Sequence, residues 1–144
     1  MSNAGATRGT GVASARNRGR AANVALWALR ALRALLAPVF AMAGLAKLGG
    51  DPAMVEMFAT IGVGQWFRYV VGALEISGAV GVLIPRVSGP AALGLVCLMA
   101  GAALTNLFVL GASPLLPLGL LVAGAVVARG GWPQTAAPAG RTRR

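Results

Sequence analysis

The 42 residues between Arg86 and Arg129 include no acidic residue and no Lys, Arg or His, and most of them are Leu, Ala, Val or Gly. About 20 apolar residues in a helix cross the hydrocarbon core of a bilayer, because each residue rises about 1.5 Å. The run is long enough for two crossings, and residues 111–114, Gly-Ala-Ser-Pro, predict the turn between them. The sequence therefore predicts an integral membrane protein.

The overall composition agrees with this interpretation. Of the 144 residues, 57% are hydrophobic and 11% are charged, whereas a soluble domain carries about 25% charged residues. The net charge of +10 also raises the question of nucleic-acid binding. However, the arginines lie in the two tails and at the ends of apolar segments, not on a folded polar face. We therefore expect the lipid bilayer as a partner and no nucleic acid.

The sequence predicts an all-α fold, a four-helix transmembrane bundle with a short interfacial helix between the first two spans. The spans are expected over about residues 26–48, 66–84, 90–110 and 114–128. The interfacial helix is expected over about residues 52–60, with Asp51 as its N-cap and Pro52 in its first turn. Ser88 is a candidate cap for the third span.

The bundle is expected to lie between two tails. Residues 1–21 and 130–144 are rich in small residues and Arg and have little apolar surface to bury. We therefore expect a disordered basic cytoplasmic tail over 1–21, a four-span membrane domain over 22–129, and a second disordered basic tail over 130–144.

The basic residues predict the orientation, because cytoplasmic loops of membrane proteins carry an excess of Lys and Arg. If the N-terminus lies inside and the chain crosses four times, Lys47 and Arg68 are the only basic residues on the outer side. The inside then holds eleven arginines: Arg8, Arg16, Arg18, Arg20, Arg30, Arg33, Arg86, Arg129, Arg141, Arg143 and Arg144. We therefore expect a multi-pass protein of the cell's inner (plasma) membrane, with both termini in the cytoplasm.

Glu75 is the one acidic residue expected within a span. It lies nine residues after Trp66, which places it roughly 13 Å below the outer interface. An ionised side chain near the bilayer centre costs about 2.5–3.5 kcal/mol, so Glu75 must face the bundle and be paired or protonated. Lys47, at the outer end of the first span, is the expected partner. Asn106, on the third span, is expected in the same outer half of the membrane.

Two interpretations of this cluster stay open. Lys47, Glu75 and Asn106 could line a small polar pocket open to the outer leaflet, since an intramembrane acid is by default a candidate functional residue. Alternatively, Lys47 neutralises Glu75 and Asn106 bonds across helices, so that the cluster is a structural clasp.

Small residues at helical spacing predict close packing between the spans. Gly72, Gly78 and Ala79 lie on the second span, and Gly94 and Gly101 lie seven residues apart on the third. Tight packing within the bundle is the simplest interpretation of these residues.

The residue types restrict the chemistry. The chain has no His, which excludes haem groups, metal sites and proton relays that depend on histidine. Cys97 is the single cysteine, so no internal disulfide forms. No nucleophile elbow, phosphate loop or dinucleotide-binding glycine pattern occurs. We therefore expect no metal and no covalently bound cofactor, and the sequence leaves open whether the protein is an enzyme.

Three segments resemble the DoxX-like family of small four-helix membrane proteins. They are residues 43–48 (Ala-Gly-Leu-Ala-Lys-Leu), 72–79 (Gly-Ala-Leu-Glu-Ile-Ser-Gly-Ala) and 105–111 (Thr-Asn-Leu-Phe-Val-Leu-Gly). The resemblance extends over about residues 26–128. It implies a four-helix membrane bundle in which Lys47 and Glu75 match intramembrane polar positions. Similar proteins often carry His where this chain has Asn106, and Asn does not titrate.

The resemblance also implies a function. Some similar proteins are implied to be membrane subunits or partners of quinone-linked redox and oxidative-stress systems. We therefore expect such a component, with a quinone as the candidate ligand and a soluble oxidoreductase docked at its basic cytoplasmic side. Two alternatives remain: a non-catalytic binder or transporter of a small lipophilic compound that uses the same pocket, or a purely structural membrane partner. The sequence does not indicate an oligomeric state.

Overall fold

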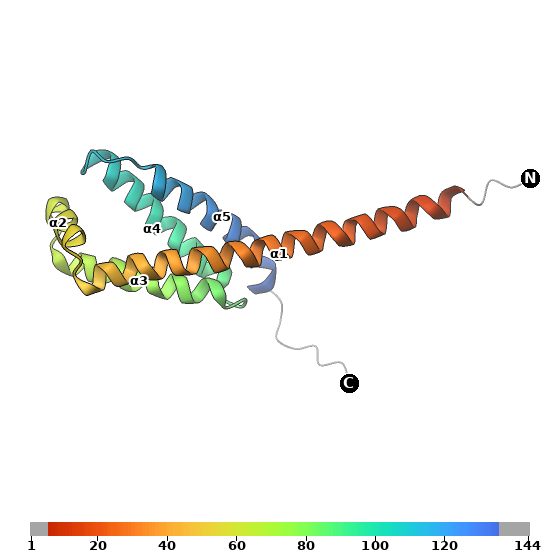
Figure 1. Cartoon of the computed structure of the whole chain (residues 1–144), viewed down its shortest axis with the longest axis horizontal. Coiled ribbons are helices and arrows are strands. Elements are labelled where there is room, and N and C mark those ends of the chain that lie inside the picture. The colour runs from red at the N-terminus through yellow and green to blue at the C-terminus, as the bar shows by residue number, and fades with distance from the viewer. Residues whose placement is uncertain (1–5, 136–144) are drawn as a thin grey trace, which may run out of the picture. The chain divides into compact units, whose positions relative to one another are not determined.

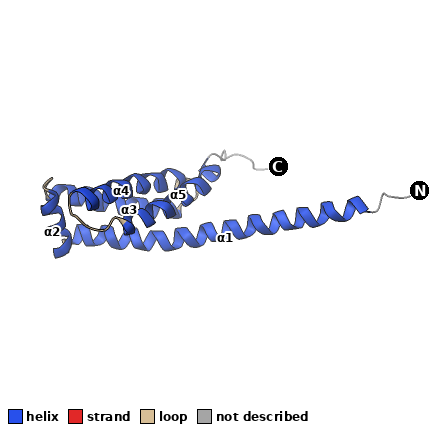
Figure 2. Cartoon of the chain, turned by 90° about the horizontal axis from the view of Figure 1, so that it is seen from above, coloured by secondary structure: helices blue, strands red, loops and turns tan. Residues whose placement is uncertain are grey.

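The computed structural model describes residues 6–135 and places them in five helices without a strand (Figure 1, Figure 2). The helices are α1 (Ala6–Gly49), α2 (Pro52–Ile61), α3 (Gln65–Leu83), α4 (Ser88–Phe108) and α5 (Leu115–Thr135). Four contain a segment long and apolar enough to cross a membrane: Asn17–Gly49, Gln65–Leu83, Ser88–Phe108 and Leu115–Trp132. The predicted all-α fold, with four long apolar helices, is confirmed.

The chain divides into two compact units, the first ending at Ala31 and the second beginning at Leu32. The first unit is helical from Ala6, whereas the sequence predicts a disordered tail up to residue 21. Alanine and arginine, which are frequent there, favour helix. All side chains of residues 17–28 are exposed, so local propensity rather than packing accounts for this helical segment. Residues 1–5 lie outside the described residues.

The second unit contains the rest of α1 and the four other helices. Residues 32–49 of α1 lie alongside α3, and α4 packs along α5 (Figure 1, Figure 2). Phe40, Val82 and Val127 are fully buried in its core. Large apolar side chains such as Leu74 and Phe108 are exposed. An outer surface of this kind fits a bundle whose outside faces lipid.

The short helix α2 begins as predicted. The Asp51 carboxylate accepts hydrogen bonds from the backbone N–H of Ala53 at 3.0 Å and of Met54 at 3.3 Å, and Pro52 lies in the first turn. The helix ends at Gly62, whose φ of 78° is left-handed and therefore favours glycine. The sequence thus specifies both ends of the helix.

The ends of α4 and α5 differ from the prediction. Ser88 is the first helical residue of α4, not its cap, and the cap position is Val87. The Ser88 hydroxyl instead donates a hydrogen bond to the Pro85 carbonyl oxygen at 3.2 Å. Helix α5 continues past Arg129 to Thr135, into the segment predicted as a disordered tail. Residues 136–144 lie outside the described residues.

Glycines account for part of the helix packing. A Cβ added at Gly78 of α3 would come within 2.5 Å of Leu95 of α4, so these helices approach closely because the residue is glycine. A Cβ at Gly94 or Gly101 would meet nothing within 4 Å. The described part of the chain therefore does not use these two glycines for tight packing, in contrast to the prediction.

Candidate functional site

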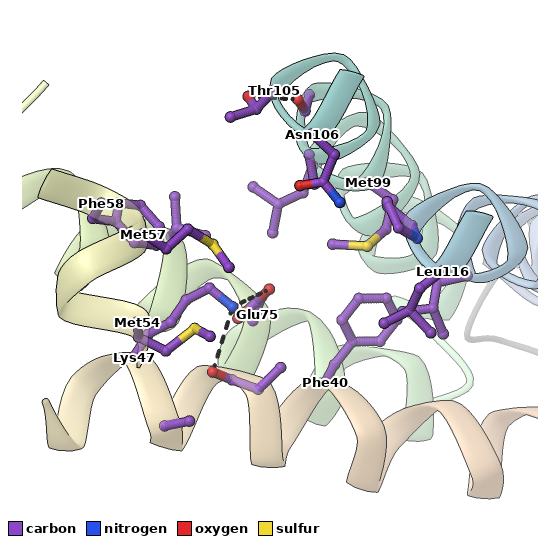
Figure 3. Close-up of a pocket in the computed structure, with 18 of the residues that line it drawn as sticks. Phe40, Lys47, Met54, Met57, Phe58, Glu75, Met99, Thr105, Asn106 and Leu116 are labelled. Carbon is purple, nitrogen blue, oxygen red and sulfur yellow. Dashed lines mark hydrogen bonds and ion pairs between the residues drawn. The ribbon is translucent and has the colours of Figure 1, made fainter. Parts of the chain in front are cut away.

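Lys47 and Glu75 form a buried ion pair between α1 and α3 (Figure 3). The Lys47 Nζ lies 2.9 Å from Glu75 Oε2 and donates a hydrogen bond to Oε1 at 3.0 Å. It also donates to the Ala43 carbonyl oxygen at 3.5 Å. The Lys47 side chain is 12% exposed and that of Glu75 is 3% exposed. The structure therefore contains the pairing that the sequence predicts.

Two glycines allow α1 and α3 to approach at this pair. Gly44 lies one helical turn before Lys47, and Gly72 lies one turn before Glu75. A Cβ at Gly44 would lie 2.7 Å from the Gly72 carbonyl oxygen and 3.3 Å from the Glu75 Cβ. A Cβ at Gly72 would lie 3.1 Å from the Lys47 Cβ. Each glycine thus lies against the charged residue of the other helix, and the two helices hold the pair in a fixed geometry.

Arg68 fixes the end of α1 that carries Lys47. Its guanidinium Nη1 donates a hydrogen bond to the Lys47 carbonyl oxygen, one of the carbonyls that a helix end leaves without an intrahelical partner. Its Nε donates to Gln65 Oε1 at 2.8 Å, and Gln65 Nε2 donates to the Val55 carbonyl oxygen at 2.9 Å. Arg68 is 3% exposed and lies 4.4 Å from the Tyr69 ring centroid. These bonds join α1, α2 and α3.

The sequence pattern indicates Arg68 only as a charge on the outer side and does not predict its bonds to Lys47 and Gln65. The available signal is its position three residues after Gln65, a spacing that brings side chains together on a helix. Its acceptor, the Lys47 carbonyl, lies 21 residues away in the chain. Only the packing of α1 against α3 brings the two together, so the sequence pattern does not specify this bond.

The ion pair lies in the wall of a cavity of about 450 Å³. All five helices contribute to its lining, which is mainly apolar. The bulky lining side chains include Phe40, Met54, Met57, Phe58 and Met99 (Figure 3).

The polar part of the lining is small. It consists of Lys47, Glu75, Thr105, Asn106 and the thiol of Cys97. Lys47 and Glu75 are the only charged members of the lining. The cavity is therefore an apolar space with one ion pair in its wall.

Asn106 lines the same cavity from α4, across from the ion pair (Figure 3). Its Nδ2 donates a hydrogen bond to the Ser113 carbonyl oxygen at 3.0 Å, so its amide also holds the turn before α5. Thr105 donates to the Gly101 carbonyl oxygen of its own helix. Thus Lys47 and Glu75 are in contact with each other, and Asn106 shares the cavity without belonging to the pair.

A model of the DoxX-like family matches residues 31–129. The chain belongs to this family. The matched residues include Lys47, Glu75 and Asn106 and most of the cavity-lining helices. Together with the four helices that are long and apolar enough to cross a bilayer, the match identifies a DoxX-like membrane protein. A search of curated proteins and a search of solved structures gave no match.

The ion pair of this DoxX-like protein has unused hydrogen-bonding capacity. Glu75 Oε2 is buried and accepts no hydrogen bond from any described residue, although it lies in ion-pair contact with Lys47. The ammonium group of Lys47 has three N–H donors. Its two hydrogen-bond acceptors are Glu75 Oε1 and, at the longer distance of 3.5 Å, the Ala43 carbonyl oxygen. The Lys47 ammonium can therefore donate a further hydrogen bond to a polar head while both charges stay paired.

The described residues contain no group of three or more His, Cys, Asp or Glu that could hold a metal ion. The cavity offers a ligand its shape, apolar contact and a few hydrogen bonds.

Proposed function

We propose that this DoxX-like protein binds a lipophilic compound with a compact polar head, and that it serves as a membrane component of a quinone-linked redox or oxidative-stress system. The observation that carries the proposal is the apolar cavity of about 450 Å³ with one buried ion pair in its wall. Ligand sites have volumes of about 300–1,000 Å³ and a few placed polar groups in an apolar lining. The cavity matches that description.

A quinone is the first candidate ligand. Its ring is flat and apolar, and its carbonyl oxygens accept hydrogen bonds, for which the Lys47 ammonium is a suitable donor. In the quinol form its hydroxyl groups donate, and the lining offers the Glu75 carboxylate and the Asn106 amide oxygen as acceptors. The aromatic and thioether side chains of Phe40, Phe58 and Met99 line the space that the ring would occupy.

The proposal also includes a partner and an orientation. In this proposal a soluble oxidoreductase would supply electrons to the bound quinone. The eleven arginines on the predicted inner side support a protein of the plasma membrane with both termini in the cytoplasm, and such a partner would dock on that basic side.

One observation favours an alternative function without electron transfer. Asn106 cannot titrate, and beyond the ion pair the cavity lining offers only the Cys97 thiol as a titratable group. A non-catalytic binder or transporter of a small lipophilic compound needs no proton relay. The interlocked Gly44 and Gly72 support a third possibility, in which the pair only fixes helix packing.

Quinone binding to the purified protein tests the proposal. A short-chain quinone is titrated against the wild type, Lys47→Met and Ser77→Ala. Ser77 lies two residues from Glu75, bonds to the Ala73 carbonyl oxygen and does not line the cavity, which makes it a matched control. We expect the wild type and Ser77→Ala to bind equally and Lys47→Met to bind about tenfold more weakly, since it lacks the donor. Absence of saturable binding to the wild type would refute the proposal.

A further inference from the structure

We propose that the cavity selects lipophiles whose polar head carries no net charge, and that the Lys47–Glu75 pair sets this selection. The inference rests on the proposed function, since it assumes that the cavity binds a lipophile, and it specifies the chemical class. It covers quinones, quinols, ketones and long-chain alcohols, and it excludes fatty-acid anions, alkylammonium cations and anionic phospholipid head groups.

The first step is the charge balance of the cavity wall. Lys47 and Glu75 are its only charged side chains, and they lie 2.9 Å apart. Arg68 of α3, which bonds to the Lys47 carbonyl oxygen, and Asp51, which precedes α2, do not line the cavity. Arg68 is directed at the Lys47 carbonyl oxygen and Gln65, and Asp51 caps α2. The wall therefore contributes one positive and one negative charge, which already neutralise each other.

The second step is the cost of adding a charge. A carboxylate ligand beside the pair would place two negative charges next to the single Lys47 ammonium, at a site where the Glu75 side chain is 3% exposed. A cationic ligand would place two positive charges next to the single Glu75 carboxylate. In either case one buried charge has no counter-charge, which is strongly unfavourable and weakens binding.

The third step is the freedom that the pair leaves to an uncharged head. Such a head can accept a hydrogen bond from the Lys47 ammonium or donate one to the Glu75 carboxylate, since both residues line the cavity. Neither bond requires the pair to separate. Gly44 and Gly72 bring α1 and α3 together at this point, so the backbone holds the two charged residues close to each other.

The test compares three twelve-carbon probes that differ in head charge: dodecanol, laurate and dodecyltrimethylammonium. Binding of each radiolabelled probe to the detergent-purified protein is measured near neutral pH, where laurate is ionised. For the wild type we expect dodecanol to bind at least about tenfold more tightly than either ion. A decyl-substituted benzoquinone should displace the bound dodecanol.

Removal of one charge should change the selection. In Glu75→Gln the unpaired Lys47 should raise the laurate affinity at least about tenfold, and in Lys47→Met the unpaired Glu75 should raise the cation affinity by a similar factor. Ser77→Ala should behave as the wild type. The double variant Lys47→Met/Glu75→Leu has a wall without net charge, as the wild type has, and should show the same preference for dodecanol. A preference of the double variant for either ion would contradict selection by the net charge of the wall.

The possible failures are distinct. If the wild type binds none of the three probes, the proposed function is wrong and this inference falls with it. If the wild type binds dodecanol and laurate equally well, the cavity is a binding site but the selection by charge is wrong. An unchanged order of affinities in well-folded Glu75→Gln would also overturn the inference.

Discussion

Lys47 and Glu75 depend on each other because both are largely buried. The Lys47 side chain is 12% exposed and the Glu75 side chain is 3% exposed, and their charged groups lie 2.9 Å apart. Removal of one partner from a buried pair leaves an uncompensated charge, whereas replacement of both by apolar residues of similar size is often nearly neutral. The energetic role of the pair is therefore visible only when the two residues are changed separately and together.

A double-mutant cycle measures this coupling. We expect Lys47→Met and Glu75→Leu to lower the free energy of unfolding by about 3 kcal/mol each, and the double variant to be much closer to the wild type. The measurement is denaturant-induced unfolding of the detergent-purified protein. Additive effects of the two changes would show that the ion pair does not couple the residues. A double variant that stays folded but no longer binds quinone would exclude a purely structural role.

Helix α1 and helix α3 approach closely only because both contribute glycine at their contact. A Cβ at Gly44 would lie 2.7 Å from the Gly72 carbonyl oxygen and 2.7 Å from the Ile76 Cγ1. Backbone atoms cannot rotate away as a flexible side chain can, so the helices themselves must separate. The position of the ion pair therefore depends on the helix contact as well as on its own charges.

Gly44→Ala tests the contact between the two helices. We expect it to lower the free energy of unfolding by about 1–3 kcal/mol through overpacking, and to weaken quinone binding because the helices that hold the pair move apart. Gly49→Ala, near the end of the same helix, is the matched control, since a Cβ there would meet nothing within 4 Å. It should be neutral or stabilising by up to about 1 kcal/mol. Equal effects of the two changes would contradict the proposed contact.

Elements that depend on local pattern could be predicted from the sequence. The charge-free run predicts the two helices α4 and α5. Asp51 and Pro52 predict the start of α2. The depth of Glu75 in the membrane predicts that it needs a partner, and Lys47 is that partner in the structure. Asp51 and Pro52 act on residues next to them in the chain. The length of an apolar run and the cost of a charge at a given depth follow from the thickness of the bilayer. Both can be read from the sequence alone.

Other features depend on how the helices meet in space. The bond from Arg68 to the Lys47 carbonyl requires α1 and α3 to meet at their ends. The cavity requires all five helices, so neither its volume nor the contribution of Met54 from α2 follows from any one segment. The Ser88 hydroxyl can either accept a hydrogen bond from backbone N–H groups of the first helical turn, as a cap does, or donate one to the carbonyl oxygen three residues before it. The sequence does not decide between these two bonds, and the structure has the second, to Pro85.

At the scale of the whole molecule, an even number of crossings places both termini on one side. Four helices have the length and apolarity to cross, and the proposed orientation assigns eleven of the twelve arginines to the cytoplasmic side. Reporter fusions test this arrangement. We expect a fluorescent protein that folds only in the cytoplasm to be active at either terminus, and an alkaline phosphatase, which requires the outer side, to be inactive at both. Termini on opposite sides would contradict four crossings.

Photo-crosslinking tests most directly whether the cavity of this DoxX-like protein holds a lipophile. A quinone with a diazirine in its side chain is irradiated with the protein in lipid nanodiscs, and the labelled residues are mapped by mass spectrometry. We predict labels concentrated on cavity residues such as Met57, Met99 and Leu116, and removed by excess unlabelled quinone. Labels spread equally over exposed residues outside the cavity, such as Leu74 and Phe108, and insensitive to the competitor would contradict a binding cavity.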